Sequence, residues 1–87
     1  MVRDGDYVAI FNSIHRVMEA ERLLKEQHLK ILLIPAPRAL AADCGLAIRY
    51  AQEARSAVEE ALAGAGLSPR ELYRKTGESL IKIEGDI

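Results

Sequence analysis

The sequence predicts an α+β domain of the ferredoxin-like class, in which the segments follow the order βαββαβ and both helices cover one face of an antiparallel sheet. Short runs rich in β-branched, leucine and aromatic residues are typical of strands and occupy residues 7–11, 30–34 and 46–50. Apolar residues recur at helical spacing over about 14–28 and 51–64. A further short apolar run follows the second helix and completes the pattern.

The length and composition predict one globular domain. The chain has 87 residues, of which 49% are hydrophobic and 29% are charged, and its formal net charge is −1. This composition is typical of folded proteins and carries no excess of basic residues of the kind that binds nucleic acid. We expect a single domain over residues 1–87, with a core at about 7–75 and a C-terminal extension at 76–87.

Several classes of site and location are disfavoured. The longest uninterrupted apolar run, residues 31–36, is too short to span a bilayer, and the N-terminus lacks the pattern of a signal peptide, so we expect a cytoplasmic protein without membrane association. The single cysteine, Cys44, cannot form an internal disulfide, which suits a reducing compartment. His15 and His28 are not spaced with Cys44 as zinc ligands are, so we expect no metal and no cofactor.

The first strand and helix are marked by their boundaries. Residues 7–11 predict a buried strand, and Asn12 or Ser13 can cap the helix that follows. The apolar face of this helix comprises Ile14, Val17, Met18 and Leu24.

Glu21 falls by helical angle inside that apolar face. One interpretation is that the edge of the face is wet and that Glu21 pairs locally with Arg22 or Lys25. The other is that its carboxylate reaches a neighbouring loop and holds Arg38 or a backbone donor, because a buried carboxylate needs a partner.

The later segments differ in their patterns. Residues 30–34 are apolar without alternation, which indicates a strand covered by helices or by a partner subunit. Residues 46–50 alternate weakly and place Leu46, Ile48 and Tyr50 on one face. Two runs, 72–75 and 80–84, are candidates for the last strand, and either or both can join the sheet.

The order of segments predicts the topology. A right-handed crossover makes the first and second strands parallel, with the third strand antiparallel between them. The start of the first helix and the connection between the second and third strands then share one end of the sheet. We therefore expect Ser13 and His15, in the first helical turn, to lie near Cys44.

The connection between the second and third strands concentrates unusual residues. Pro35 and Pro37 each fix φ and remove a backbone donor, so the chain leaves the second strand along a rigid path. Arg38 follows at once, and Cys44, the only cysteine, precedes Gly45. A glycine beside a reactive sulfur permits positive φ and close approach of the backbone.

These residues predict a reactive thiol. The guanidinium of Arg38 and the helix N-terminus both favour a thiolate at Cys44 and lower its pKa, whereas Asp43 raises this pKa or instead orients Arg38. His15 is a candidate base for the thiol, although a histidine in a first helical turn is more often solvated. A lone cysteine is also often a small buried hydrophobic residue. We interpret Arg38 and Cys44 as the site.

The motifs resemble those of the selenium/sulfur carrier-like family. The resemblance lies in the Ser-x-His helix start with an embedded glutamate, in Ile-Pro-x-Pro-Arg at 34–38 and in Cys-Gly-Leu-Ala-Ile-Arg-Tyr at 44–50, and it covers about residues 7–73. Its most specific positions are Pro35, Pro37, Arg38, Cys44 and Gly45. Members of the family often carry small hydroxyl residues before the cysteine, whereas this chain has Ala41, Ala42 and Asp43 there.

The resemblance implies a carrier or transfer module rather than a turnover enzyme. Cys44 would hold a sulfur or selenium atom between a donor protein and an acceptor protein, with Arg38 stabilising the anion. We also expect a homodimer, because a small chain with an apolar strand gains stability from a second subunit. The alternative is a non-enzymatic interaction or small-ligand-binding module, in which Arg38 holds a carboxylate or phosphate.

Overall fold

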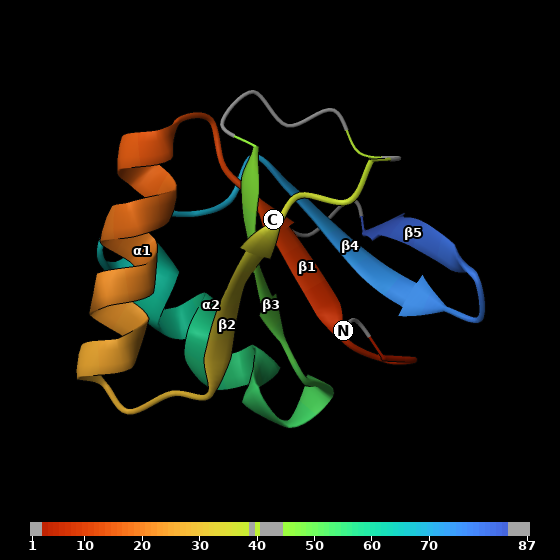
Figure 1. The fold of residues 1–87 in the computed structure, drawn as a ribbon. Coiled ribbons are helices and arrows are strands. Elements are labelled where there is room, and N and C mark those ends of the chain that lie inside the picture. The colour runs from red at the N-terminus through yellow and green to blue at the C-terminus, as the bar shows by residue number, and fades with distance from the viewer. Residues whose placement is uncertain (1–2, 39, 41–44, 84–87) are drawn as a thin grey trace.

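Five strands form one antiparallel sheet in the order β2-β3-β1-β4-β5, and two α-helices pack against it (Figure 1). The computed structural model describes residues 3–38, 40 and 45–83. The strands are β1 (Tyr7–Ile10), β2 (Ile31–Pro35), β3 (Leu46–Tyr50), β4 (Glu71–Thr76) and β5 (Ser79–Ile83). The helices are α1 (Ile14–Glu26) and α2 (Arg55–Gly64), and the short 3-10 helix η1 (Gln52–Ala54) leads into α2.

The arrangement of the first three strands confirms the predicted topology. β3 lies between β1 and β2 and is antiparallel to both, so β1 and β2 run parallel to each other. The weak alternation in β3 also predicted its faces correctly, because Ile48 and Tyr50 lie in the larger core cluster and Ala47 lies in the smaller one.

The predicted four-strand ferredoxin-like sheet is wrong in its number of strands. Both C-terminal candidates join the sheet, β4 beside β1 and β5 beside β4. The reason lies in the loop between Thr76 and Ser79, which begins with Gly77 at a φ of 61°. A glycine with positive φ at the first position of a two-residue loop folds the chain back as a tight hairpin. Residues 79–83, which the sequence placed in an extension, thus form β5.

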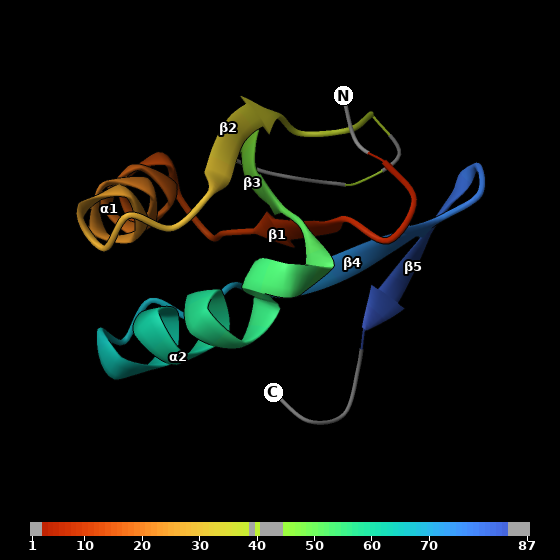
Figure 2. The same ribbon diagram turned by 90° about the horizontal axis from the view of Figure 1, so that it is seen from below.

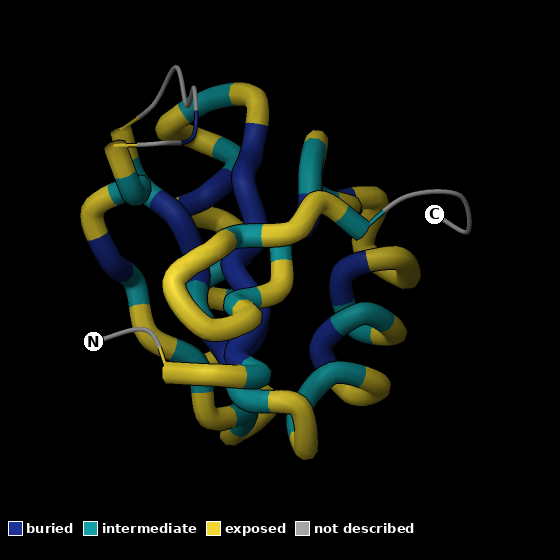
Figure 3. The backbone as a smooth tube through the Cα atoms, turned by 90° about the vertical axis from the view of Figure 1, so that its right-hand side faces the viewer, coloured by how far each residue is buried: buried dark blue, intermediate teal, exposed yellow. Residues whose placement is uncertain are grey.

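The larger hydrophobic core lies between the helices and the sheet. Figure 2 shows α1 and α2 on the same side of the strands, as the sequence predicted. Figure 3 shows buried positions in the middle of the molecule and on the inward side of the helical coil at the right. Val17 and Leu24 of α1 and Val58 and Leu62 of α2 pack here. The sheet contributes Tyr7, Ala9, Ile48, Tyr50 and Leu72.

A smaller core lies on the opposite face of the sheet. It contains Val8, Ile10, Ile34 and Ala47 from the strands together with Leu40 from the β2–β3 connection, and all of these residues are buried. Every residue of β1 is therefore buried, because its side chains enter the two cores alternately. The connection that carries the predicted site is anchored on this second face through Leu40.

Helix α1 is closed at both ends by local hydrogen bonds. The hydroxyl of Ser13 accepts from the backbone N–H of Arg16 at 3.3 Å, which makes Ser13 the N-cap. At the other end, the N–H of His28 donates to the carbonyl of Lys25 at 2.9 Å and the N–H of Leu29 donates to that of Leu24 at 3.0 Å. This pair of bonds is a Schellman motif, in which His28 takes the left-handed conformation with a φ of 61°.

Candidate functional site

The β2–β3 connection is closed at its base and turned near its middle. The N–H of Ala36 donates to the carbonyl of Gly45 at 2.9 Å, which extends the β2–β3 pairing by one step beyond Pro35 and Leu46. The N–H of Leu40 donates to the carbonyl of Pro37 at 2.9 Å and forms a tight turn. Arg38 lies inside this turn and is exposed. Leu40, two residues later, is buried in the smaller core, so the exposed Arg38 lies beside the point where the connection is anchored.

Gly45 has the conformation that the sequence suggested. Its φ is +74°, which L-residues with a side chain rarely adopt. A Cβ built at this position meets nothing within 4 Å, so the glycine is needed for its backbone conformation and not for room.

Of the remaining residues predicted in the connection, two prolines are described by the structure and two residues are not. Pro35 is the exposed last residue of β2 and pairs with Leu46, while Pro37 is half-buried. Asp43 and Cys44 lie outside the described residues, so the predicted thiol site stays a prediction.

The residues predicted on α1 have local roles in the structure. Ser13 caps the helix and His15 is exposed in its first turn. The carboxylate of Glu21 lies 2.9 Å from Nζ of Lys25, one turn along the same helix, which is the local pairing among the two interpretations. The start of α1 and the β2–β3 connection share one end of the sheet (Figure 1), as the topology predicted.

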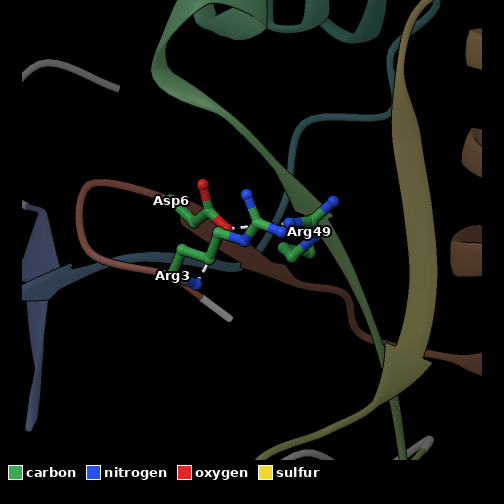
Figure 4. Close-up of polar contacts among 3 residues, drawn as sticks. All are labelled: Arg3, Asp6 and Arg49. Atoms are coloured by element: carbon green, nitrogen blue, oxygen red, sulfur yellow. Dashed lines mark hydrogen bonds and ion pairs between the residues drawn. The ribbon is translucent and has the colours of Figure 1, made fainter. Parts of the chain in front are cut away.

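A buried carboxylate that the sequence did not single out lies on the face opposite the helices (Figure 4). Asp6 is 5% exposed, and its Oδ2 accepts from the backbone N–H of Arg3 at 2.9 Å and from Nη1 of Arg49 at 2.8 Å. Arg49 projects from β3 on this face, level with Val8 of β1. The only sequence signal for this pair is the predicted alternation of β3, which puts Arg49 on the face away from the larger core.

A second polar cluster, also absent from the sequence prediction, joins the start of α2 to the sheet. The rings of Tyr7 and Tyr50 stack with centroids 5.7 Å apart. Arg55 donates from Nη1 to the hydroxyl of Tyr7 at 2.9 Å and from Nε to Glu59 at 2.8 Å. The spacing of Arg55 and Glu59 is a signal of an ion pair along a helix, but it does not reveal the tyrosines beneath.

The described part of the chain holds neither a cluster of metal ligands nor a membrane-spanning helix. Within residues 3–38, 40 and 45–83, no three His, Cys, Asp or Glu side chains are grouped as metal ligands. Neither helix in this part of the chain combines the length and apolar character needed to cross a bilayer.

The comparison with protein families covers most of this fold. A model of the family described as "Putative Se/S carrier protein-like" matches residues 6–74. The chain belongs to this family. The matched range begins at Asp6 and ends in β4, so it includes α1, α2 and the β2–β3 connection with Arg38 and Gly45. The family resemblance seen in the sequence is thereby confirmed. No curated protein and no solved structure matches the chain.

Proposed function

We propose that this chain carries sulfur or selenium on Cys44 and passes it from a donor protein to an acceptor protein. Membership of the Se/S carrier-like family supports this function. The structural observation that supports it best is that Arg38 is exposed on the β2–β3 connection. The base of this connection is held by the hydrogen bond from Ala36 to Gly45, the residue after Cys44. An exposed guanidinium is suited to an anionic thiolate or persulfide, because it keeps its positive charge at every physiological pH.

The transfer needs no outside oxidant or reductant. The Cys44 thiolate attacks the terminal sulfur of a donor persulfide, the sulfur–sulfur bond of the donor breaks, and the donor leaves as a thiolate. Cys44 then holds the persulfide, and a thiolate of the acceptor removes the terminal sulfur in the same way. Selenium follows the same route as the terminal atom of a selenopersulfide. One cysteine is sufficient, since the transferred atom leaves with the next thiol.

The other predicted residues have supporting roles in this proposal. Arg38 stabilises the negative charge, Gly45 gives the backbone its turn, and Pro35 and Pro37 stiffen the approach to the turn. The negative charge of Asp43 raises the pKa of the Cys44 thiol, or its carboxylate instead orients Arg38. The protein works in the cytoplasm, where thiols stay reduced, and it works as a homodimer.

The decisive experiment measures the reactivity of Cys44 and its sulfur uptake. We expect the native protein to react readily with a small alkylating reagent at neutral pH. After mixing with a low-molecular-weight persulfide and removal of the excess, intact-protein mass spectrometry should show one added sulfur atom, which a thiol reductant removes.

Cys44→Ser is the matched control, and it should fold with an unchanged amide spectrum yet gain no sulfur. A native thiol that resists alkylation until the protein is denatured would falsify the carrier function. In that case the interaction or ligand-binding alternative takes its place, with Arg38 as an anion-binding residue.

A further inference from the structure

The outer side of β2 is an open edge of the sheet with a fixed pattern of backbone groups. The N–H of Ala36 donates to the carbonyl of Gly45, its register partner, and hydrogen-bonded pairs alternate along an antiparallel ladder. Ile31 and Leu33 therefore direct their N–H and C=O groups outward, away from β3. No other strand of the described chain pairs with this side of β2.

One flank of α1 lies above this edge. The helix packs over β2 and β3, and α2 lies beside it toward β4 (Figure 2). Arg16 marks the flank that faces α2, because its Nη2 donates at 2.7 Å to the carbonyl of Gly66, just after that helix. Ile14, Met18 and Lys25 lie about 160–180° around α1 from Arg16, so they belong to the flank on the side of the β2 edge. Ile14 and Met18 are each 43% exposed.

The open groups of β2 match a second copy of the same strand in one antiparallel register. With Leu32 opposite Leu32 of the second copy, Ile31 of each strand meets Leu33 of the other, and all four outward N–H groups donate to outward carbonyls. A shift by two residues in one direction sets Ile31 against Pro35, which has no N–H. A shift in the other direction sets Leu33 against Leu29, whose N–H already closes the Schellman motif after α1.

The same register brings two α1 helices together above the seam. Strands lie about 4.8 Å apart, so two helices that each sit over β2 and β3 come within about 10 Å, the distance of packed helices. β2 runs back along α1, so Leu32 lies level with the second half of the helix, where Glu21 and Lys25 pair at 2.9 Å. A two-fold axis reverses the order of these charges in the second copy, so Glu21 of one copy faces Lys25 of the other.

We propose that a second copy of this chain docks on the β2 edge in this register, with Leu32 against Leu32 on one face of the joined sheet and the α1 flanks packed on the other. The inference rests on the homodimer of the proposed function and requires no thiol. The two β2–β3 connections then begin at opposite ends of the seam. About eight strand residues, or about 26 Å, separate Ala36 of one copy from Ala36 of the other, so each subunit presents its own transfer site to donor and acceptor proteins.

The test maps the register by cysteine cross-linking in the Cys44→Ser background. Residues directly opposite in a pair without mutual hydrogen bonds have Cα atoms about 4.5 Å apart, which a disulfide can span. We expect Leu32→Cys, incubated with oxidised glutathione at tens of micromolar, to give a disulfide-linked dimer on a non-reducing gel. Lys30→Cys, at the exposed residue just before β2, is the matched control. Its two copies lie about 13 Å apart in this register, so it should run as a monomer.

The contact between the helices has its own test. Met18→Lys places a charge between the two α1 flanks and should weaken the dimer about tenfold in sedimentation equilibrium. Ala57→Lys, at an exposed position of α2, is the control and should leave the affinity unchanged.

Three results would overturn the interface. They are a dimeric Leu32→Cys protein that does not cross-link, a Lys30→Cys protein that cross-links as well, and equal dimer affinities for Met18→Lys and Ala57→Lys. A native monomer also overturns it and contradicts the homodimer of the proposed function as well. Sulfur uptake by the native protein is measured separately, so a failed interface leaves the transfer function standing.

Discussion

Arg38 is exposed on a turn whose next described residue, Leu40, is buried, so its side chain can be changed without disturbing a core. If Arg38 stabilises an anion at Cys44, Arg38→Ala should raise the pKa of the thiol and slow alkylation at neutral pH. Arg38→Lys should recover only part of the rate, because an ammonium lacks the planar fork of the guanidinium. The measurement is the alkylation rate as a function of pH. Identical profiles for the native protein and Arg38→Ala would show that the arginine serves another purpose.

Asp6 and Arg49 form the most deeply buried of the ion pairs between described residues, with side chains 8% and 24% exposed. We expect a double-mutant cycle of Asp6→Ala and Arg49→Met to give a coupling free energy of about 1–2 kcal/mol, because burial limits screening by solvent. The measurement is the free energy of unfolding in urea.

The control cycle uses Arg22 and Glu26, whose side chains are 71% and 65% exposed at 3.9 Å. This surface pair should give a coupling below about 0.5 kcal/mol. Equal couplings for the two pairs would contradict a stabilising role of burial at Asp6.

At the scale of single elements, the C-terminus of α1 contains a residue in an unfavourable conformation. His28 occupies the left-handed position of a Schellman motif. A residue with a Cβ is strained in this backbone conformation, whereas glycine adopts it without strain. His28→Gly should therefore stabilise the protein by about 0.5–1 kcal/mol, seen as a higher urea midpoint with an unchanged slope.

Gln27→Gly is the matched control one residue earlier. Gln27 has a φ of −90°, so glycine there relieves no strain and adds flexibility to the unfolded chain. We expect this substitution to be neutral or destabilising. A gain of stability from Gln27→Gly but not from His28→Gly would exclude the conformational explanation.

The sequence predicted most elements because their patterns are local. The periodicity of α1, the cap at Ser13 and the alternation of β3 are each determined by neighbours along the chain. It did not choose between the two C-terminal runs, because their pairing depends on the conformation of Gly77 and on β1, which is distant in sequence. Glu21 was likewise ambiguous, because helical angle gives the face of a residue but not the rotamer that brings Lys25 within 2.9 Å.

The site was predictable only in part, for a related reason. The motif around Arg38 and Gly45 is contiguous, so the sequence alone suggested both residues, and the positive φ of Gly45 agrees with its type. Their role beside a thiol stays a prediction. The cluster of Tyr7, Tyr50 and Arg55 brings together residues from two strands and a helix, and no spacing in the sequence encodes it.

At the scale of the whole molecule, β2 is an exposed edge with an apolar side chain on it. The bond from Ala36 to Gly45 sets the phase of the β2–β3 ladder, so the amides of Ile31 and Leu33 point away from β3. Leu32 is 44% exposed. An edge with open donors and an exposed leucine is a surface that a second copy can extend.

We therefore expect the native protein to sediment as a dimer at tens of micromolar, a range in which a modest interface is occupied. Leu32→Lys should shift it to monomer by placing a charge at the interface. Ile81→Lys on β5, the opposite edge strand, changes a residue that is 51% exposed and should leave the dimer intact. A native monomer at these concentrations would exclude the proposed homodimer.

The central position of β1 also determines when the chain can fold during its synthesis. All four residues of β1 are buried, and its two partners, β3 and β4, come from residues 46–50 and 71–76. A ribosome therefore releases the middle strand of the sheet long before either neighbour, and one edge of β1 stays open until β4 has left the exit tunnel. Until then the nascent chain exposes an apolar strand with unpaired amides, the kind of segment that chaperones protect from aggregation.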